Sequence, residues 1–146
     1  MIYKDLHASI AKFCATFGTN SNATFVAFDN SWDDADLPEG DIVGPLGLTF
    51  ELNDQLVEGS VQIGFSTKDD KNLFRLSDQV AKLTELLRPT NKIQMYDATT
   101  GGKVGDMVIL NGTKVMPVAG TKSRPIQFVA ISFLTTVTYQ LPGSYV

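Results

Sequence analysis

Residues 46–66 of the chain read LGLTFELNDQLVEGSVQIGFS, and this stretch contains two runs in which apolar and polar side chains alternate. In the first run, residues 46–53, every second residue is leucine or phenylalanine. The second run, residues 57–66, alternates in the same way with valine, isoleucine and phenylalanine. A period of two places successive side chains on opposite faces of a strand. Because polar residues 53–55 separate the runs, the sequence predicts a hairpin of two half-buried strands.

Two amphipathic helices are expected on either side of this hairpin. Residues 3–17 and 71–88 both carry apolar side chains at spacings of three and four, which gather on one helical face. Gly18 and Pro89 are placed to end them. The stripes are Ile2, Leu6, Ile10, Phe13 and Phe17 in the first helix, and Leu73, Leu76, Val80, Leu83 and Leu87 in the second. We expect Leu76, Val80 and Leu83 to pack against Val61, Ile63 and Phe65.

The rest of the chain favours shorter strands at 24–28 and 92–97, and a second hairpin of 107–110 with 113–118 around Asn111-Gly112. A long final strand is expected at 126–139. Over 126–134 both of its faces are apolar, so it needs cover on both sides. Either the strand bends around the core of its own domain, or a neighbouring subunit covers part of it.

These elements predict an α+β fold, with a mixed or mostly antiparallel sheet packed with two helices, plus a β-hairpin extension. The 146 residues suit a single domain, 1–146. No apolar run is long enough to span a bilayer, and the first residues lack the apolar core of a signal peptide. A soluble protein made in a cytoplasm is therefore expected.

Charge is unevenly distributed along the sequence. The formal net charge is −4, which is unlike the basic composition of nucleic-acid-binding proteins. Residues 1–66 hold two bases and ten acids, whereas residues 67–146 hold ten bases and six acids. The split is either the chance outcome of a small protein or a sign of two complementary faces that join copies head to tail.

Catalytic and cofactor motifs are not found. His7 and Cys14, the single histidine and the single cysteine, lie too far apart along a helix to share a zinc ion, and Cys14 is expected in the core. The acidic segment 29–41 lacks the glycine and glutamate of an EF-hand, and residues 97–104 lack a complete phosphate loop. We therefore expect no enzyme activity, no cofactor and no metal.

The order of the elements resembles that of the bacteriophage tail-terminator (tail-completion) family. The closest points are the run Val61-Gln62-Ile63-Gly64-Phe65, which leads into the second helix, and the final run from Phe133 to Tyr139. The resemblance implies a structural virion protein that forms a ring, usually a hexamer, at the head-proximal end of the tail tube. Its implied partners are other copies, the tail tube protein and a head-completion or neck protein. DNA would pass through the ring without specific binding, and no membrane is involved.

The resemblance places the protein in the tail or neck of a virion, after assembly in the host cytoplasm. Another tube, neck or baseplate subunit is the alternative within that class. A small ligand-binding or enzymatic domain is the alternative outside it. For a ring, we expect acidic residues to meet basic ones across the subunit boundary, around an apolar centre from the last strand. The expected interface residues are Asp33, Asp34, Asp36, Arg75, Arg124, Val129, Ile131 and Phe133.

Overall fold

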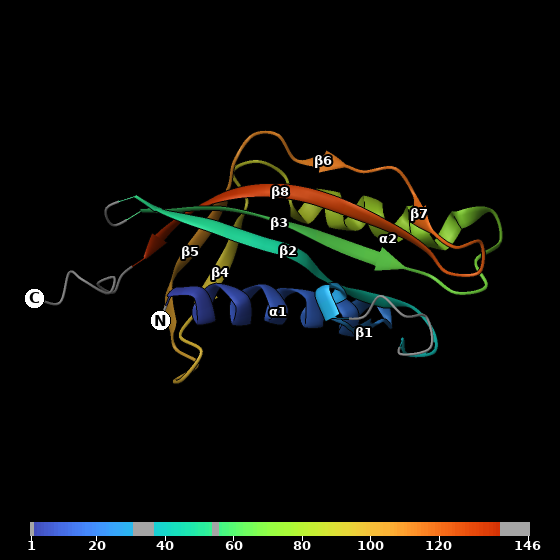
Figure 1. Cartoon of the computed structure of the whole chain (residues 1–146), viewed down its shortest axis with the longest axis horizontal. Coiled ribbons are helices and arrows are strands. Elements are labelled where there is room, and N and C mark those ends of the chain that lie inside the picture. The colour runs from blue at the N-terminus through green and yellow to red at the C-terminus, as the bar shows by residue number, and fades with distance from the viewer. Residues whose placement is uncertain (1, 31–36, 54–55, 138–146) are drawn as a thin grey trace, which may run out of the picture.

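The computed structural model describes residues 2–30, 37–53 and 56–137. Within these ranges, two α-helices combine with one mixed eight-stranded sheet, which confirms the predicted α+β class (Figure 1). The helices are α1 (Ile2–Ser21) and α2 (Phe74–Leu86). The strands are β1 (Thr24–Phe25), β2 (Ile42–Asn53), β3 (Leu56–Ser66), β4 (Lys92–Tyr96), β5 (Lys103–Ile109), β6 (Lys114–Val115), β7 (Ala119–Gly120) and β8 (Pro125–Val137).

The sheet has the strand order β1-β2-β3-β8-β5-β4, and β6 and β7 also pair with β8. Only β1 and β2 are parallel among these pairs. The central pair, β3 with β8, runs along the long axis of the molecule (Figure 1). Helix α1 packs against both β2 and β4, which lie far apart in the strand order. The sheet therefore curls, and α1 lies across the opening of the curl.

The main core lies between one face of this sheet and the two helices. Adjacent residues of a strand point to opposite faces, and Val129, Ile131 and Phe133 of β8 share the face that carries Val61 and Ile63 of β3. All of them belong to one buried cluster with residues from both helices. The expected packing is confirmed, because Leu76, Val80 and Leu83 join Val61, Ile63 and Phe65 in that cluster.

A second, smaller core lies on the other face of β8. It consists of Val26, Phe28, Ile42 and Phe128, with the rings of Phe28 and Phe128 5.6 Å apart in an edge-to-face arrangement. Gly64 makes room for Phe128, since a Cβ at this glycine would lie 2.5 Å from the phenylalanine ring. The chain itself therefore covers both faces of β8 around residue 128, which supports the first of the two readings of this long apolar strand.

Helix α1 continues past Gly18 to Ser21, so the expected end at Gly18 is wrong. The Ala23 N–H donates to the Gly18 carbonyl at 2.8 Å, and a Cβ on Gly18 would lie 2.6 Å from the Ala23 carbonyl oxygen. Glycine therefore allows the following chain to approach closely, rather than ending the helix. On the same helix, Ser9 Oγ accepts from the Tyr96 N–H at 2.8 Å, which fixes α1 to β4.

Strand β2 begins at Ile42, earlier than the alternation indicates, and its pairing with β3 shifts between Leu46 and Thr49. Gly47 has φ +69° inside this irregularity, a conformation that glycine adopts without strain. The shift sends Leu46 to the smaller core, whereas Leu48 and Phe50 pack against the main one. The single buried face expected for these alternating residues is therefore wrong.

The other differences concern short elements. The strand expected at 24–28 is reduced to β1, and Phe28 lies in a 3-10 turn. Helix 71–88 begins as a 3-10 turn and becomes α-helical at Phe74. The hairpin expected around Asn111-Gly112 is wrong in its pairing, because β5 and β6 both pair with β8 and not with each other. Residues 103–109 and 119–120, expected partly as loops, form strands β5 and β7.

Candidate interaction surfaces

Arg75 and Arg124, the two arginines expected at a subunit boundary, bind the segment 37–41 of their own chain. Arg75 Nε lies 2.7 Å from Asp41 Oδ2, and its Nη2 lies 2.9 Å from Asp41 Oδ1. This paired carboxylate raises the pKa of Arg75. Arg124 is only 9% exposed and donates to the carbonyl oxygens of Pro38 at 2.8 Å and Gly40 at 2.5 Å.

We call this arrangement the clasp: residues 37–41 held by Lys68, Arg75 and Arg124. Lys68 completes it, since its Nζ lies 2.7 Å from Glu39 Oε2. This hydrogen bond from Lys68 is the main reason that the pKa of Glu39 lies below its ordinary value. The expected attraction between the acidic first half and the basic second half of the chain therefore acts within one subunit. Arg75 and Arg124 both have partners in their own chain, and their roles at a subunit interface stay a prediction.

The apolar residues expected at the boundary are also placed differently. Val129, Ile131 and Phe133 are fully or almost fully buried in the main core. Their burial by α1, α2 and neighbouring strands of the same chain leaves them no surface for a partner, so this part of the prediction is wrong. Asp33, Asp34 and Asp36 lie outside the described residues.

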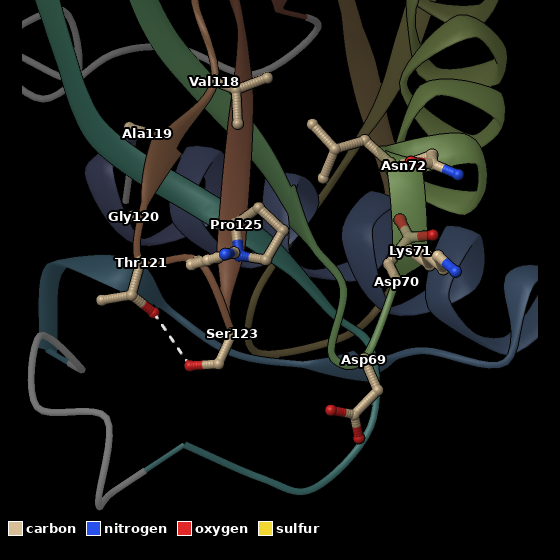
Figure 2. A pocket seen from close by; sticks show the side chains of 12 residues that line it. Asp69, Asp70, Lys71, Asn72, Val118, Ala119, Gly120, Thr121, Ser123 and Pro125 are labelled. Carbon is tan, nitrogen blue, oxygen red and sulfur yellow. Dashed lines mark hydrogen bonds between the residues drawn. The ribbon is translucent and has the colours of Figure 1, made fainter.

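An open cleft of about 760 Å³ lies between the start of α2 and β7, next to the clasp. Figure 2 shows the segment 69–72 on one side of it and the segment 118–123 on the other. Its charged lining residues are Asp69, Asp70, Lys71 and Lys122. No histidine or cysteine lines it, so it brings together no nucleophile and base of the kind used in Cys–His or Ser–His catalysis.

The α2 side of this cleft has an unusual backbone. Asp69, Asn72 and Leu73 have φ values of 56°, 64° and 60°, in the left-handed region that non-glycine residues rarely adopt. Asp70 supports this turn by accepting from the backbone N–H groups of Arg75 at 3.1 Å and Leu76 at 2.8 Å. Burial raises the pKa of Asp70, but these hydrogen bonds outweigh it and hold the pKa below its ordinary value.

Phe74 follows directly as the first residue of α2 and is 75% exposed. It was missed in the sequence, although the pattern contains a signal. The apolar stripe of this helix runs through Leu73, Leu76 and Val80, and Phe74 lies off that stripe. A large apolar residue outside the stripe of a well-patterned helix is a candidate contact residue.

The second candidate surface lies at the opposite end of the long axis, where β2 and β3 end at Asn53 and Leu56 (Figure 1). We call it the arm end. Leu52 and Leu56 are exposed here, as is Tyr3, whose ring lies 5.6 Å from that of Phe50. Glu51 and Glu58 are exposed and directly opposite each other in the β2–β3 ladder. Like charges in that position repel each other, and neither forms an ion pair with a described residue.

The residues considered for chemistry are dispersed. His7 is exposed and stacks on Tyr3, whereas Cys14 is buried, which raises the pKa of its thiol to about 12. In the loop of residues 97–102, the Asp97 carboxylate accepts from the N–H groups of Thr99 and Thr100, so the loop forms a turn around its own side chain. Among residues 2–30, 37–53 and 56–137, no three metal-binding side chains gather at one point.

No helix in the described part of the chain is both long enough and apolar enough to cross a membrane. No protein-family model matches the sequence, and no curated protein is similar to it. Four chains of solved structures match. One of them, whose name carries no functional description, aligns over 95% of this chain and 96% of its own, with a TM-score of 0.59 and 9% identity. At that identity the likeness shows the fold alone.

Proposed function

We propose that this protein is a structural subunit of a bacteriophage tail: a tail terminator that assembles as a ring, usually of six copies, on the head-proximal end of the tail tube. In this role it stops growth of the tube and offers a surface to a head-completion or neck protein. The order of elements supports the proposal, because an N-terminal helix, a strand pair, a second helix and a long last strand follow one another as in that family.

The observation that carries the proposal is the position of the exposed apolar side chains. Five of the seven large apolar residues that are exposed in the described chain lie at the two ends of the long axis: Tyr3, Leu52 and Leu56 at the arm end, and Phe74 and Val118 beside the cleft. Apolar patches on a soluble protein mark contact surfaces. Two different patches at opposite ends suit a contact in which each subunit binds the next, and such contacts form a ring where the rotation between copies closes and an open filament where it does not.

The electrostatic properties are compatible with a channel for DNA. The net charge of the chain is −4, and like charge keeps a DNA duplex from adhering to the wall of a channel. Shape and contact surfaces carry this function, so it needs neither a cofactor nor a catalytic group.

Electron microscopy of negatively stained protein, with and without purified tail tubes, tests the proposal. We expect rings with a central hole, or a cap at one end of the tube. Sedimentation over a range of protein concentrations gives the mass of the free species. Protein that stays monomeric at all concentrations and binds no tube contradicts the proposal, and a ligand-binding or enzymatic role then becomes the better hypothesis.

A further inference from the structure

We propose that the arm end of one subunit docks into the cleft between α2 and β7 of the next copy. This inference rests on the proposed ring and names the two surfaces that form it. The arm end contributes Leu52, Leu56, Glu51 and Glu58, and the cleft contributes Val118, Lys71 and Lys122, with Phe74 directly after the lining residue Leu73.

The cleft is built to present an apolar anchor. Two consecutive left-handed residues, Asn72 and Leu73, precede Phe74 and set the direction in which α2 begins. Such backbone strain persists where the surrounding structure or a function requires it. Its result here is a phenylalanine that is 75% exposed next to a cleft. Aromatic side chains that become buried on binding dominate the energetics of many protein interfaces.

The charges that remain after the clasp forms are complementary at the two ends. Lys71 and Lys122 both line the cleft and form no ion pair with a described residue. Two acids share the cleft with them. The Asp70 carboxylate is occupied by helix N–H groups and by the Thr67 hydroxyl, whereas Asp69 is exposed. Lysines of the next copy would reduce the repulsion between the facing residues Glu51 and Glu58.

A second copy is the occupant that fits these observations. The arm end and the cleft lie at opposite ends of the long axis, so they cannot meet within one subunit (Figure 1). The arm end presents the facing acids Glu51 and Glu58, whereas the cleft presents Lys71 and Lys122 beside Asp69 and Asp70. Joining the two surfaces repeatedly uses a different patch on each side of every contact, and such a heterologous contact forms a ring where its rotation closes.

Directed disulfide formation tests this contact. The native Cys14 is buried with its thiol pKa raised to about 12, so it stays unreactive in the background. Leu56→Cys protein and Val118→Cys protein are mixed, oxidised mildly and analysed by mass. We expect a disulfide between the two variants only when both are present, and little disulfide from either variant alone. Leu86→Cys is the matched control for Leu56→Cys, because the two side chains are 48% and 47% exposed and Leu86 lies outside both surfaces.

Charge reversal is the second arm of the test. Glu51→Lys with Glu58→Lys, or Lys71→Glu with Lys122→Glu, should each weaken assembly by on the order of tenfold or more, since like charges then face each other across the contact. Combining all four changes in one chain should restore most of the affinity. Asp69→Asn should strengthen assembly, and Lys92→Glu, which lies on β4 away from both surfaces, should leave it unchanged.

The outcomes separate this inference from the proposed function. Rings that form with normal affinity in both double variants, or disulfides that form equally with the Leu86→Cys control, overturn the contact but leave the ring in place. Efficient disulfides within Leu56→Cys protein alone indicate a symmetric contact and also overturn it. Wild-type protein that neither assembles nor binds tubes overturns the contact and the proposed function together.

Discussion

The clasped end and the arm end of this molecule use acidic residues in opposite ways. At the clasped end, Asp41 and Glu39 have basic partners within 2.7 Å in the same chain. At the arm end, Glu51 faces Glu58 across the β2–β3 ladder, and neither has a basic partner among the described residues. The two groups come from the same acidic half of the sequence. The first group is paired within the subunit, and in the proposed contact the second group binds the next copy.

Apolar side chains follow the same division. The smaller core beside the clasp buries Phe28, Ile42 and Phe128, whereas Leu52 and Leu56 at the arm end remain about half exposed. Substitutions can therefore distinguish residues that stabilise the subunit from residues that contribute to assembly. The four predictions below make that distinction, in order of expected effect.

The largest effect is expected for Phe128→Ala. Its ring fills the space above Gly64 and packs on Phe28, so truncation leaves a cavity in the smaller core. We expect a loss of about 3–5 kcal/mol in the free energy of unfolding, measured by urea denaturation. Leu52→Ala is the arm-end counterpart and should change stability by less than about 0.5 kcal/mol. Similar losses in both variants would refute the division between the two ends.

The clasp itself is tested by Arg124→Ala. This change removes a 9% exposed guanidinium and leaves the Pro38 and Gly40 carbonyl oxygens without their donor. We expect a loss of about 1.5–3 kcal/mol in the free energy of unfolding, the range for hydrogen bonds that involve a charged group. Arg88→Ala is the matched control, because the Arg88 side chain is 62% exposed and pairs only with Glu85 three residues before it. Equal stability of the Arg124→Ala variant and the wild type would show that the clasp does not hold this end.

Local patterns in the sequence were sufficient for the fold class and the main core. The alternation in residues 57–66 and the helical stripe through Leu76, Val80 and Leu83 both survive in the structure, since each depends on neighbours along one element. The alternation in residues 46–53 predicted the wrong face for Leu46. The register shift between Leu46 and Thr49 places the side chains before and after it on opposite faces of the sheet. The turn signal at Asn111-Gly112 did not produce a hairpin, because the strands beside it pair with β8 instead.

The candidate surfaces were harder to predict, because they depend on contacts between distant segments. Arg124 binds carbonyl groups more than eighty positions earlier in the chain, at Pro38 and Gly40, and no local pattern indicates such a partner. The total charge of each half could not show which acids are paired within the subunit. The last strand was expected to be covered either by its own domain or in part by a neighbouring subunit, and the core of its own chain buries Val129, Ile131 and Phe133. Phe74 carried the one signal that sequence reasoning could have used.

The turn that presents Phe74 is tested by pH. The pKa of Asp70 is lowered in the folded protein, so its carboxylate adds stability above its unfolded pKa of about 3.9, and this contribution disappears as the pH falls through the lower folded value. Asp70→Ala should therefore cost about 1 kcal/mol at pH 7, the typical value for a helix-capping carboxylate. It should also reduce the acid dependence of the melting temperature below pH 4. Asp78→Ala, whose side chain is 64% exposed, should change neither quantity appreciably.

The smallest effect on stability, and the sharpest comparison, is expected for Glu58→Lys. The change replaces a like-charged cross-strand pair with Glu51 by an opposite-charge pair. The free energy of unfolding of the monomer should increase by about 0.2–1 kcal/mol. The increase should lie near the lower end of this range, because both side chains are exposed. The gain should shrink in high salt, which screens surface charges. Glu58→Gln is the control for removal of the charge alone.

The same Glu58→Lys variant should assemble less well, because it brings a new lysine toward Lys71 and Lys122 of the next copy. A change that stabilises the subunit and weakens assembly separates the two roles within one residue. Sedimentation at low salt measures the second effect, and thermal unfolding at low protein concentration measures the first. If stability and assembly both increase, the arm end does not meet a basic surface. If the stability of the monomer falls, Glu58 stabilises the subunit as the clasp residues do, and the contrast between the two ends is lost.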